Sequence, residues 1–420
     1  MKIYNSRIFF LIENLIIVIF SIYFFLWSQS LFFFDERLIV VLLIPLYFFI
    51  KTDHLDKYSF FFFLILISLI LFHLILNNFF FDKGLFENLD AVLGSALIAL
   101  VAILYRSFLI KNLSKVIYFF ISILVFFFFI EIFFFNNLYS INNFDCLNGW
   151  FSNVNLKLFS ENSHFGMIAP AVICYMIFKK EQKKILNYLS LILIIFLFLF
   201  LSTTLLIGII LCLLIFIFTK FKIFNKFQKI TSLSLLIACV ILVFSKPQCN
   251  MRLSETVQGI YINYISKSKE NPNLKEEWKK SLYNGSLNQS SEVTLNSYSV
   301  SLNSLKNYPF GVGINNYIVS YRKFSEELSL STWDVNKEDG SNNFSKLLSE
   351  FGLFSFVLFL IIFNYALRDD EDFFNNTFFY SIIITQFLRG AGYFNGGFLL
   401  SLFIILLSSF LKKNNVKKIS

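Results

Sequence analysis

Residues 58–77 read YSFFFFLILISLILFHLILN, and the run contains no Lys, Arg, Asp or Glu. About 20 apolar residues, each rising about 1.5 Å along a helix, cross a hydrocarbon core of about 30 Å, so this run predicts a transmembrane helix. The whole chain has the same character. Of its 420 residues, 57% are hydrophobic, 60 are Phe and 15% are charged, whereas soluble domains carry about 25% charged residues. This composition excludes a soluble enzyme, a secreted disulfide scaffold, a collagen-like chain and a disordered chain.

Comparable apolar runs predict an all-α polytopic membrane protein with about 12 transmembrane helices. The first run has no small-residue cleavage site, so we expect a retained helix and not a signal peptide. The predicted spans lie near residues 8–27, 37–50, 58–77, 89–106, 115–136, 164–179, 185–201, 203–219, 229–246, 344–367, 373–390 and 396–411.

Basic residues distinguish the two sides of the membrane. Only Arg37, Lys83, Lys157, Lys246 and Arg389 fall on one set of short connections and span ends. By the positive-inside rule the other set is cytoplasmic, which places both termini in the cytoplasm and makes the span count even. That set holds Lys2, Arg7, Lys51, Lys57, Arg106, Lys111, Lys115, Lys179, Lys180, Lys183, Lys184, Lys220, Lys222, Lys226, Lys229, Arg368, Lys412, Lys413, Lys417 and Lys418.

The run from Ile185 to Phe218 would be about 51 Å long as one helix, too long for an upright span. Lysine clusters flank both of its ends, and a single span would place one cluster outside. We therefore expect two short helices that turn at Ser202, Thr203 and Thr204. Short paired helices often mark a site within the membrane, and they are as readily ordinary spans.

Four parts of the chain follow from this reading. Residues 1–246 hold nine spans, 247–343 form one large periplasmic loop, 344–411 hold three spans, and 412–420 form a basic cytoplasmic tail. Long translocated segments escape the charge rule, so the loop can be basic and still external. Within it, LKEEWKKSLYN from Leu274 predicts one helix, and VTLNSYSVSLNSLKNY predicts a second that ends at Pro309.

The five cysteines give little guidance. Cys174, Cys212 and Cys239 fall inside predicted spans, where a small apolar role is the default. Cys146 and Cys249 both map to the external side and can pair if that side is oxidising. Because no CxxC or HExxH spacing occurs, we predict no metal site.

Two candidate catalytic residues stand at the mouth of the sixth span, in FSENSHFGMIAP. Glu161 and His164 lie one helical turn apart, and a carboxylate beside an imidazole suits proton transfer. The alternative is a plain helix start, with Ser160 as the N-cap and Glu161 favoured by the helix dipole.

Further candidates lie at the end of the loop. NYPFGVGINNYIVSYRKF contains a Gly-rich turn whose backbone amides can meet an anion or a sugar, followed at helical spacing by Tyr317 and Arg322; a plain turn is the alternative. In DGSNNFSKLLSEFGLF, Asn342 and Asn343 lie at the interface, and Glu350 lies about two turns into the tenth span. An ionisable residue inside a span is a functional candidate, and a buried helix-to-helix hydrogen bond is its alternative.

The eleventh span closes with QFLRGAGYFNGGF, which contains Arg389 and Tyr393. A guanidinium group binds phosphate oxygens in a planar fork and stays charged. The competing explanation is that Arg389 snorkels to the external interface. His73, between Phe72 and Leu74, is expected to be a packing residue and not a ligand.

The architecture and the order of these motifs resemble the superfamily of O-antigen polymerases and O-antigen ligases of bacterial envelopes. The features that carry the resemblance are SENSHFGMIAP, the short spans around FLSTTLLIG, the long loop ending in NYPFGVGINNY, SNNFSKLLSEFGLFSF and LRGAGYFNGG. It covers the chain from Glu161 onward, and the first half only by hydropathy.

The resemblance implies a bacterial inner-membrane glycosyltransferase whose active site faces the periplasm. Its donor would be an undecaprenyl-pyrophosphate-linked oligosaccharide, with no metal, no cofactor and no nucleic acid; a chain-length regulator and a flippase would be further partners. An acceptor hydroxyl would attack the anomeric carbon, which requires a base and cations for the leaving pyrophosphate. Arg389 and Arg322 are the clamp candidates, and His164 or Glu350 the proton-transfer candidates.

Two departures favour a polymerase over a ligase. Ligase-like members carry a His-Asn pair before the Glu of the motif, and here Asn342 matches the Asn while Ser341 occupies the His position. Many also carry an Arg after the Ser/Thr turn, where this chain has Leu205. The rival from another class is a transporter or flippase, against which stand the long external segment and the absence of a visible internal repeat. A structural envelope protein is a further alternative.

Overall fold

The computed structural model describes residues 2–25, 36–49, 57–81, 88–135, 162–179, 202–245, 258, 289–325, 336–367, 371–390 and 392–416, and this part of the chain contains helices and no strand. The all-α prediction is therefore confirmed. The helices are α1 (Lys2–Phe25), α2 (Glu36–Tyr47), α3 (Lys57–Phe81), α4 (Leu89–Phe135), α5 (Asn162–Phe178), α7 (Thr203–Lys220), α8 (Lys226–Ser245), α11 (Gln289–Asn307), α12 (Tyr317–Phe324), α13 (Asn343–Phe351), α14 (Phe354–Leu367), α15 (Glu371–Asn375), α16 (Thr377–Leu388) and α17 (Phe398–Val416).

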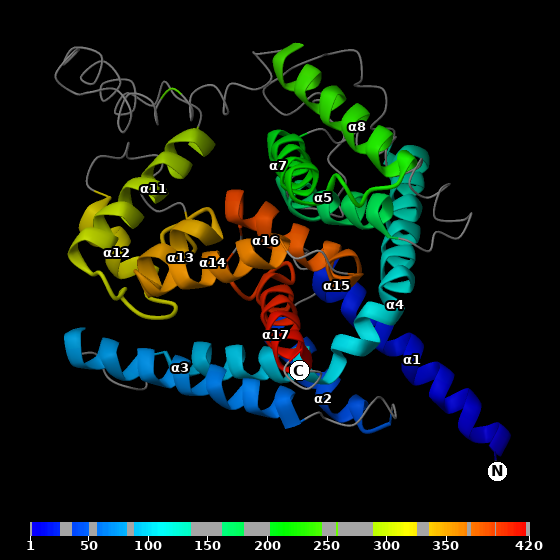
Figure 1. Ribbon diagram of the computed structural model, residues 1–420, viewed down its shortest axis with the longest axis horizontal. Coiled ribbons are helices and arrows are strands. Elements are labelled where there is room, and N and C mark those ends of the chain that lie inside the picture. Colours follow the sequence, from blue (N-terminus) through cyan, green and yellow to red (C-terminus); the bar gives the residue numbers. More distant parts are fainter. Residues whose placement is uncertain are drawn as a thin grey trace.

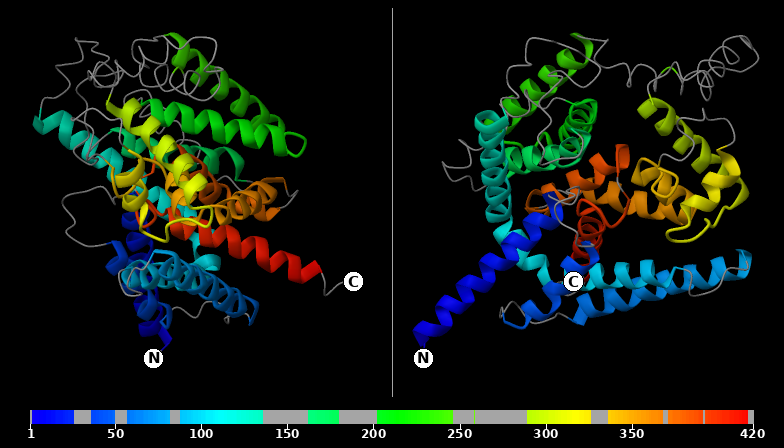
Figure 2. Two further views of the ribbon diagram at one scale, coloured as in Figure 1. Left: turned by 90° about the vertical axis from the view of Figure 1, so that its left-hand side faces the viewer. Right: turned by 180° about the vertical axis from the view of Figure 1, so that it is seen from behind.

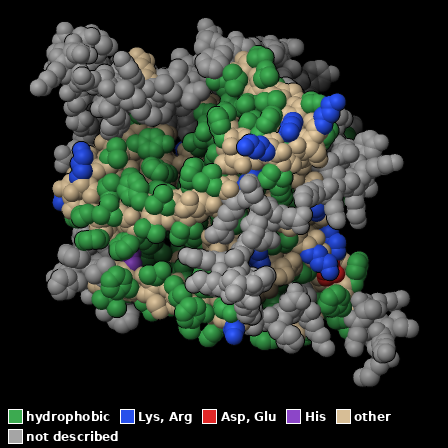
Figure 3. Space-filling model, in the orientation of Figure 1, with side chains coloured by type: hydrophobic (Ala, Val, Ile, Leu, Met, Phe, Trp, Pro, Cys, Tyr) green, Lys and Arg blue, Asp and Glu red, His purple; other side chains and the backbone are tan. Residues whose placement is uncertain are grey.

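Several helices are apolar enough to belong in a membrane. Five described helices, α1, α3, α4, α7 and α8, contain windows long and apolar enough to cross one, and parts of α5, α14, α16 and α17 are shorter and apolar. Figure 3 shows hydrophobic side chains spread over the visible face. Such a surface is stable when it meets hydrocarbon in place of water. The count of twelve spans and the external position of the loop stay predictions.

The predicted spans 89–106 and 115–136 belong to a single helix, α4. Figure 1 shows it running beside α3 and then turning upright. The expected connection is helical because its apolar side chains are buried: Leu109 and Leu113 are fully covered. The charged residues there bond to other helices, Arg106 to Ser408 Oγ at 2.9 Å and Lys115 to Glu13 at 2.6 Å.

The helices α5, α7 and α16 form the centre of the bundle (Figures 1 and 2). Gly208 of α7 lies against Pro170 of α5 and Thr385 of α16, where a Cβ would approach to 2.9 Å and 3.0 Å. One turn further along α7, Cys212 lies 3.9 Å from the carbonyl oxygen of Ser381, four residues before Thr385. The helix α16 is therefore antiparallel to α7.

The predicted hairpin turn is partly described. The helix α7 begins at Thr203, and the hydroxyl of Ser202 accepts a hydrogen bond from the amide of Leu205 at 3.2 Å, as an N-cap does. The first helix of the pair, 185–201, lies outside the described residues. So do Glu161, Cys146, Cys249, the helix predicted from Leu274, and residues 417–420.

The described part of the loop packs as a serine-rich unit of α11, α12 and the following α13. The predicted helix ending at Pro309 is confirmed, since α11 ends at Asn307. Small hydroxyl side chains let the helices approach closely: Ser304 of α11 and Ser320 of α12 are hydrogen-bonded at 2.8 Å. His73 of α3 joins this unit through a hydrogen bond from Nε2 to the Phe310 carbonyl oxygen at 3.1 Å, which agrees with a packing role.

The predicted span 344–367 is divided into α13 and α14 at Gly352. Gly352 has φ 53°, and a Cβ there would lie 2.2 Å from the carbonyl oxygen of Pro309. The backbone of the loop therefore occupies the space that a side chain would need. As a result Glu350 lies on a short helix before the apolar segment, and not two turns down a continuous span.

Candidate functional site

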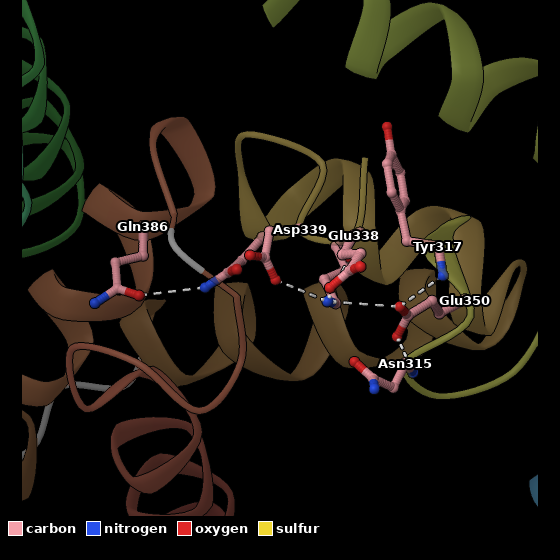
Figure 4. A network of polar contacts seen from close by, with 8 residues as sticks. Asn315, Tyr317, Glu338, Asp339, Glu350 and Gln386 are labelled. Carbon is pink, nitrogen blue, oxygen red and sulfur yellow. Dashed lines mark hydrogen bonds and ion pairs between the residues drawn. The ribbon is translucent and has the colours of Figure 1, made fainter. Parts of the chain in front are cut away.

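A chain of charged groups follows α13 (Figure 4). Lys346 Nζ lies 3.2 Å from Asp339 Oδ1 and 3.9 Å from Glu350 Oε1. It also donates to the carbonyl oxygen of Glu338 at 2.8 Å. The side chains of Lys346 and Glu350 are 2% and 0% exposed, whereas that of Asp339 is 46% exposed. Two charges of this network are therefore internal, and one reaches the surface.

The start of α13 explains the two predicted asparagines. Asn342 has an extended backbone, and its Oδ1 accepts from the amide of Ser345 at 2.8 Å, so it is the N-cap. Its Nδ2 donates to Ser297 Oγ on α11 at 3.0 Å. Asn343 Nδ2 donates to Gln386 Oε1 on α16 at 3.2 Å. The side-chain amides of Asn342 and Asn343 thus fasten the start of α13 to two different helices, α11 and α16.

The contact between Asn343 and Gln386 places the end of α16 beside the start of α13. Gln386 Nε2 donates to the carbonyl oxygen of Gly396 at 2.8 Å, which closes the segment after the helix. The amide of Gly390 donates to the carbonyl oxygen of Ser341 at 3.1 Å. Because a Cβ on Gly390 would lie 2.7 Å from Asn343, this position favours glycine. Arg389, one residue earlier, is therefore next to the start of α13.

The Gly-rich turn packs on the other end of α13. The amides of Val312 and Gly313 donate to the carbonyl oxygens of Ser349 and Glu350 at 3.0 Å and 2.9 Å. The last carbonyl groups of a helix need such external donors. Gly311 has φ 84°, and a Cβ there would lie 2.1 Å from the Glu350 carbonyl oxygen. Two distant motifs therefore form one structural unit.

Glu350 completes this unit by binding the start of α12. Its Oε2 accepts from the amide of Asn315 at 2.9 Å and its Oε1 from the amide of Tyr317 at 3.1 Å. Asn316, the N-cap residue, makes no capping bond with its side chain. The carboxylate thus satisfies amides at a helix N-terminus. The amides of Asn315 and Tyr317 therefore bind a carboxylate of the protein itself, and the binding of a ligand anion or a sugar by this turn stays a prediction.

Burial changes the proton affinity of the site. Loss of hydration raises the pKa of Glu350 to about 7, and this rise is opposed by Lys346, by the amides of Asn315 and Tyr317 and by the side chain of Tyr393. Burial also raises the pKa of Tyr317, and that of Tyr393, so both phenols stay protonated. The Glu350 carboxyl group therefore keeps its proton to a higher pH than an exposed glutamate does.

The structure brings together most of the predicted site residues. Asn342, Asn343, Glu350, Tyr317 and Tyr393 all belong to the network around α13. Tyr393 joins it through its ring, which lies 5.1 Å below Lys346 Nζ.

His164 and Arg389 lie at the same end of the central bundle. Cys174 contacts Cys212, one turn beyond the contact of Pro170 with Gly208, so α5 runs parallel to α7 and antiparallel to α16. The first turn of α5 and the last turn of α16 therefore meet at one end. His164 and Arg389 are both partly exposed there. Arg322, in contrast, is on the exposed side of α12.

Three members of the site were not predicted as site residues: Asp339, Lys346 and Gln386. Lys346 and Glu350 are four residues apart, a spacing that places a salt bridge on one helix face and was a usable signal. Asp339 and Gln386 carried no local signal, because their partners come from other segments. Among the described residues, no group of three or more His, Cys, Asp or Glu side chains could hold a metal ion.

The site thus combines buried supporting residues with partly exposed reactive groups. Asp339, His164 and Arg389 offer a carboxylate, an imidazole and a guanidinium at one end of an apolar bundle, which suits proton transfer and the binding of an anion. A comparison of the chain with protein-family models found no match, and a comparison with curated proteins found none either.

Proposed function

We propose that the chain is a membrane glycosyltransferase of the O-antigen polymerase type, which joins undecaprenyl-pyrophosphate-linked oligosaccharide units on the periplasmic face of the bacterial inner membrane. The observation that carries the proposal is the convergence of Asn342, Asn343, Tyr393, Arg389 and His164 at one end of an apolar helical bundle. They come from three segments far apart in the sequence, and packing energy alone does not require polar groups to gather there.

The reaction needs two kinds of group. The oxygen of an acceptor hydroxyl forms a bond to the anomeric carbon of the donor, the bond from that carbon to the pyrophosphate oxygen breaks, and the pyrophosphate leaves with the electron pair. A base takes the hydroxyl proton, and a cation stabilises the leaving group. His164 is our base, and Asp339 is the member of the network whose carboxylate reaches the surface. Arg389 is our cation for the pyrophosphate.

Glu350 has a different role in this proposal. It is fully buried, and both of its oxygens already accept backbone amides. We therefore propose that Glu350 is a positioning residue. It holds the start of α12 and the Gly-rich turn against α13, and does not itself contact the substrate. Asn342 and Asn343 are positioning residues of the same kind, because their amide groups fasten α13 to α11 and α16.

One observation favours a polymerase over a ligase. Ser341 stands where ligase-like chains carry His, and it is 2% exposed, with its hydroxyl 3.0 Å from that of Ser297. A serine hydroxyl cannot take up a proton near neutrality, so the ligase-type base has no equivalent at this position.

Surface lipopolysaccharide of a deletion strain, resolved on a gel, tests the proposal. Loss of a polymerase leaves core bearing at most one repeat unit, whereas loss of a ligase leaves the core bare. A transport assay with a non-polymerisable lipid-linked unit tests the alternative that the protein is a flippase. Movement of that unit across a bilayer by the purified protein would reject the polymerase proposal in favour of a flippase.

A further inference from the structure

A cavity of about 330 Å³ lies between α3, α13, α14 and α17. The described residues that line it are mainly Leu, Ile, Val and Phe. The polar ones are His73, Ser95, Ser355 and Tyr393, and none of the lining residues is Lys, Arg, Asp or Glu. Apolar cavities of this kind exclude water, so the natural occupant is itself apolar.

The exposure of the lining residues shows where the cavity opens. Leu69 and Phe72 of α3 are 59% and 53% exposed, and Phe354 and Val357 of α14 are 42% and 56% exposed. On the opposite wall, Leu402 of α17 is 4% exposed. The mouth therefore lies between two apolar helices whose outer surfaces suit a bilayer, and the cavity runs inward from there to α17.

We propose that this cavity binds the acyl chain of a bilayer phospholipid, which enters sideways between α3 and α14. The volume is at the lower end of the range for small-molecule sites, about 300–1,000 Å³, which fits one chain and not a whole two-chain lipid. A phosphate or pyrophosphate group would need a cation, and the lining provides none. The head group therefore stays at the membrane surface, and the cavity is separate from the place of a pyrophosphate donor.

Residues of the inner wall of the cavity also contact the candidate site around α13. Tyr393 lines the cavity, and its ring lies below Lys346 Nζ at 5.1 Å. Phe351, the residue after Glu350, lines it too and stacks on His73 with ring centroids 4.6 Å apart. A bound chain would supply the packing contacts that these rings lack on the cavity side. The acyl chain thus supports α13 from within the membrane, whatever reaction the site performs.

Photocrosslinking tests the proposal on the full chain. The purified protein is placed in phosphatidylglycerol vesicles that contain phosphatidylglycerol with a photoreactive group on one acyl chain, and the adducts are mapped by peptide mass spectrometry. We expect adducts on Leu402 and Phe403, which line the cavity and are nearly buried. Adducts confined to the outer face of α14, at Leu360 and Phe363, would overturn the proposal.

A matched pair of variants sharpens the test. Leu358 lines the cavity, whereas Leu360 of the same helix is 59% exposed and is not among the lining residues. Leu358→Trp should abolish the adducts on α17 by filling the cavity, and Leu360→Trp should retain them. Unchanged adducts in Leu358→Trp would contradict the proposal; if that variant does not insert, the wild-type adduct map decides. Displacement of the probe by polyprenyl phosphate, but not by unlabelled phosphatidylglycerol, would reject an acyl chain as the occupant.

Discussion

The carboxylate of Glu350, near the end of α13, accepts a hydrogen bond from the backbone amide of Tyr317, the first residue of α12, at 3.1 Å. The two residues belong to motifs that the sequence separates by 33 positions. Their contact makes the Gly-rich turn and the SNNFSKLLSEFG segment one folded unit.

Replacement of Glu350 by Gln should destabilise the protein by about 1–3 kcal/mol, since one of the two backbone amides that the buried carboxylate binds would lose its acceptor. The apparent melting temperature in detergent measures this. Glu13→Gln is the matched control, because Glu13 pairs with a half-exposed Lys115 and such pairs contribute about 0–1 kcal/mol. Equal melting temperatures for Glu350→Gln and wild type would show that the carboxylate does not hold α12.

The pH dependence of stability should carry the signature of Glu350. Burial raises its pKa from an ordinary 4.5 to about 7 in the folded protein. The folded state therefore binds the proton more tightly, so this contribution is fully present below 4.5 and is lost as the pH rises through about 7. Melting temperatures measured across that window should fall more steeply in wild type than in Glu350→Gln. Parallel curves would assign the slope to other groups.

Gly311→Ala should cost more than about 2 kcal/mol, from the strain of a positive φ together with overpacking against the Glu350 carbonyl group. Thermal unfolding measures the loss, and Asn307→Ala, at an exposed position on α11, is the control. A melting temperature close to that of the control would mean that the turn and α13 do not pack as described.

Arg389→Ala should abolish long polysaccharide chains while the protein remains inserted, because the leaving pyrophosphate would lose a charge-assisted partner. The gel ladder of a complemented deletion strain measures chain length, and immunoblotting of membranes measures insertion. Arg106→Ala, which removes an arginine bonded to Ser408, should leave the ladder intact. A normal ladder from Arg389→Ala removes this residue from the site.

His164→Ala should lower turnover and remove the corresponding limb from the pH–rate profile, because the proposed base would be lost. Rates with purified lipid-linked repeat units across pH measure this. His73→Phe is the control, since it keeps a ring to stack on Phe351 and should leave the pH profile unchanged. Retained turnover with an unaltered profile in His164→Ala would return His164 to a helix-start role.

Much of the site was visible in the sequence as separate motifs. Asn342, Asn343 and Glu350 were singled out within their motif. The N-cap role of Asn342 and the pairing of Lys346 with Glu350 were not predicted, although both depend on neighbours within a few residues. The role of Glu350 was not visible, because a carboxylate shows no preference in the sequence between a substrate and a distant backbone amide. The connection expected between two spans around Lys111 was misread for a similar reason: charge suggested a loop, and buried Leu109 and Leu113 made it helix.

The sequence by itself determined that the described part of the chain is all-helical, with apolar helices suited to a membrane, because hydropathy and helix length are properties that add up residue by residue along a segment. Only the tertiary structure decided that Gly352 divides the tenth apolar run and that Glu350 binds the start of α12. Each of these depends on which backbone or helix lies opposite, and such a pairing is set by packing between segments far apart in the chain.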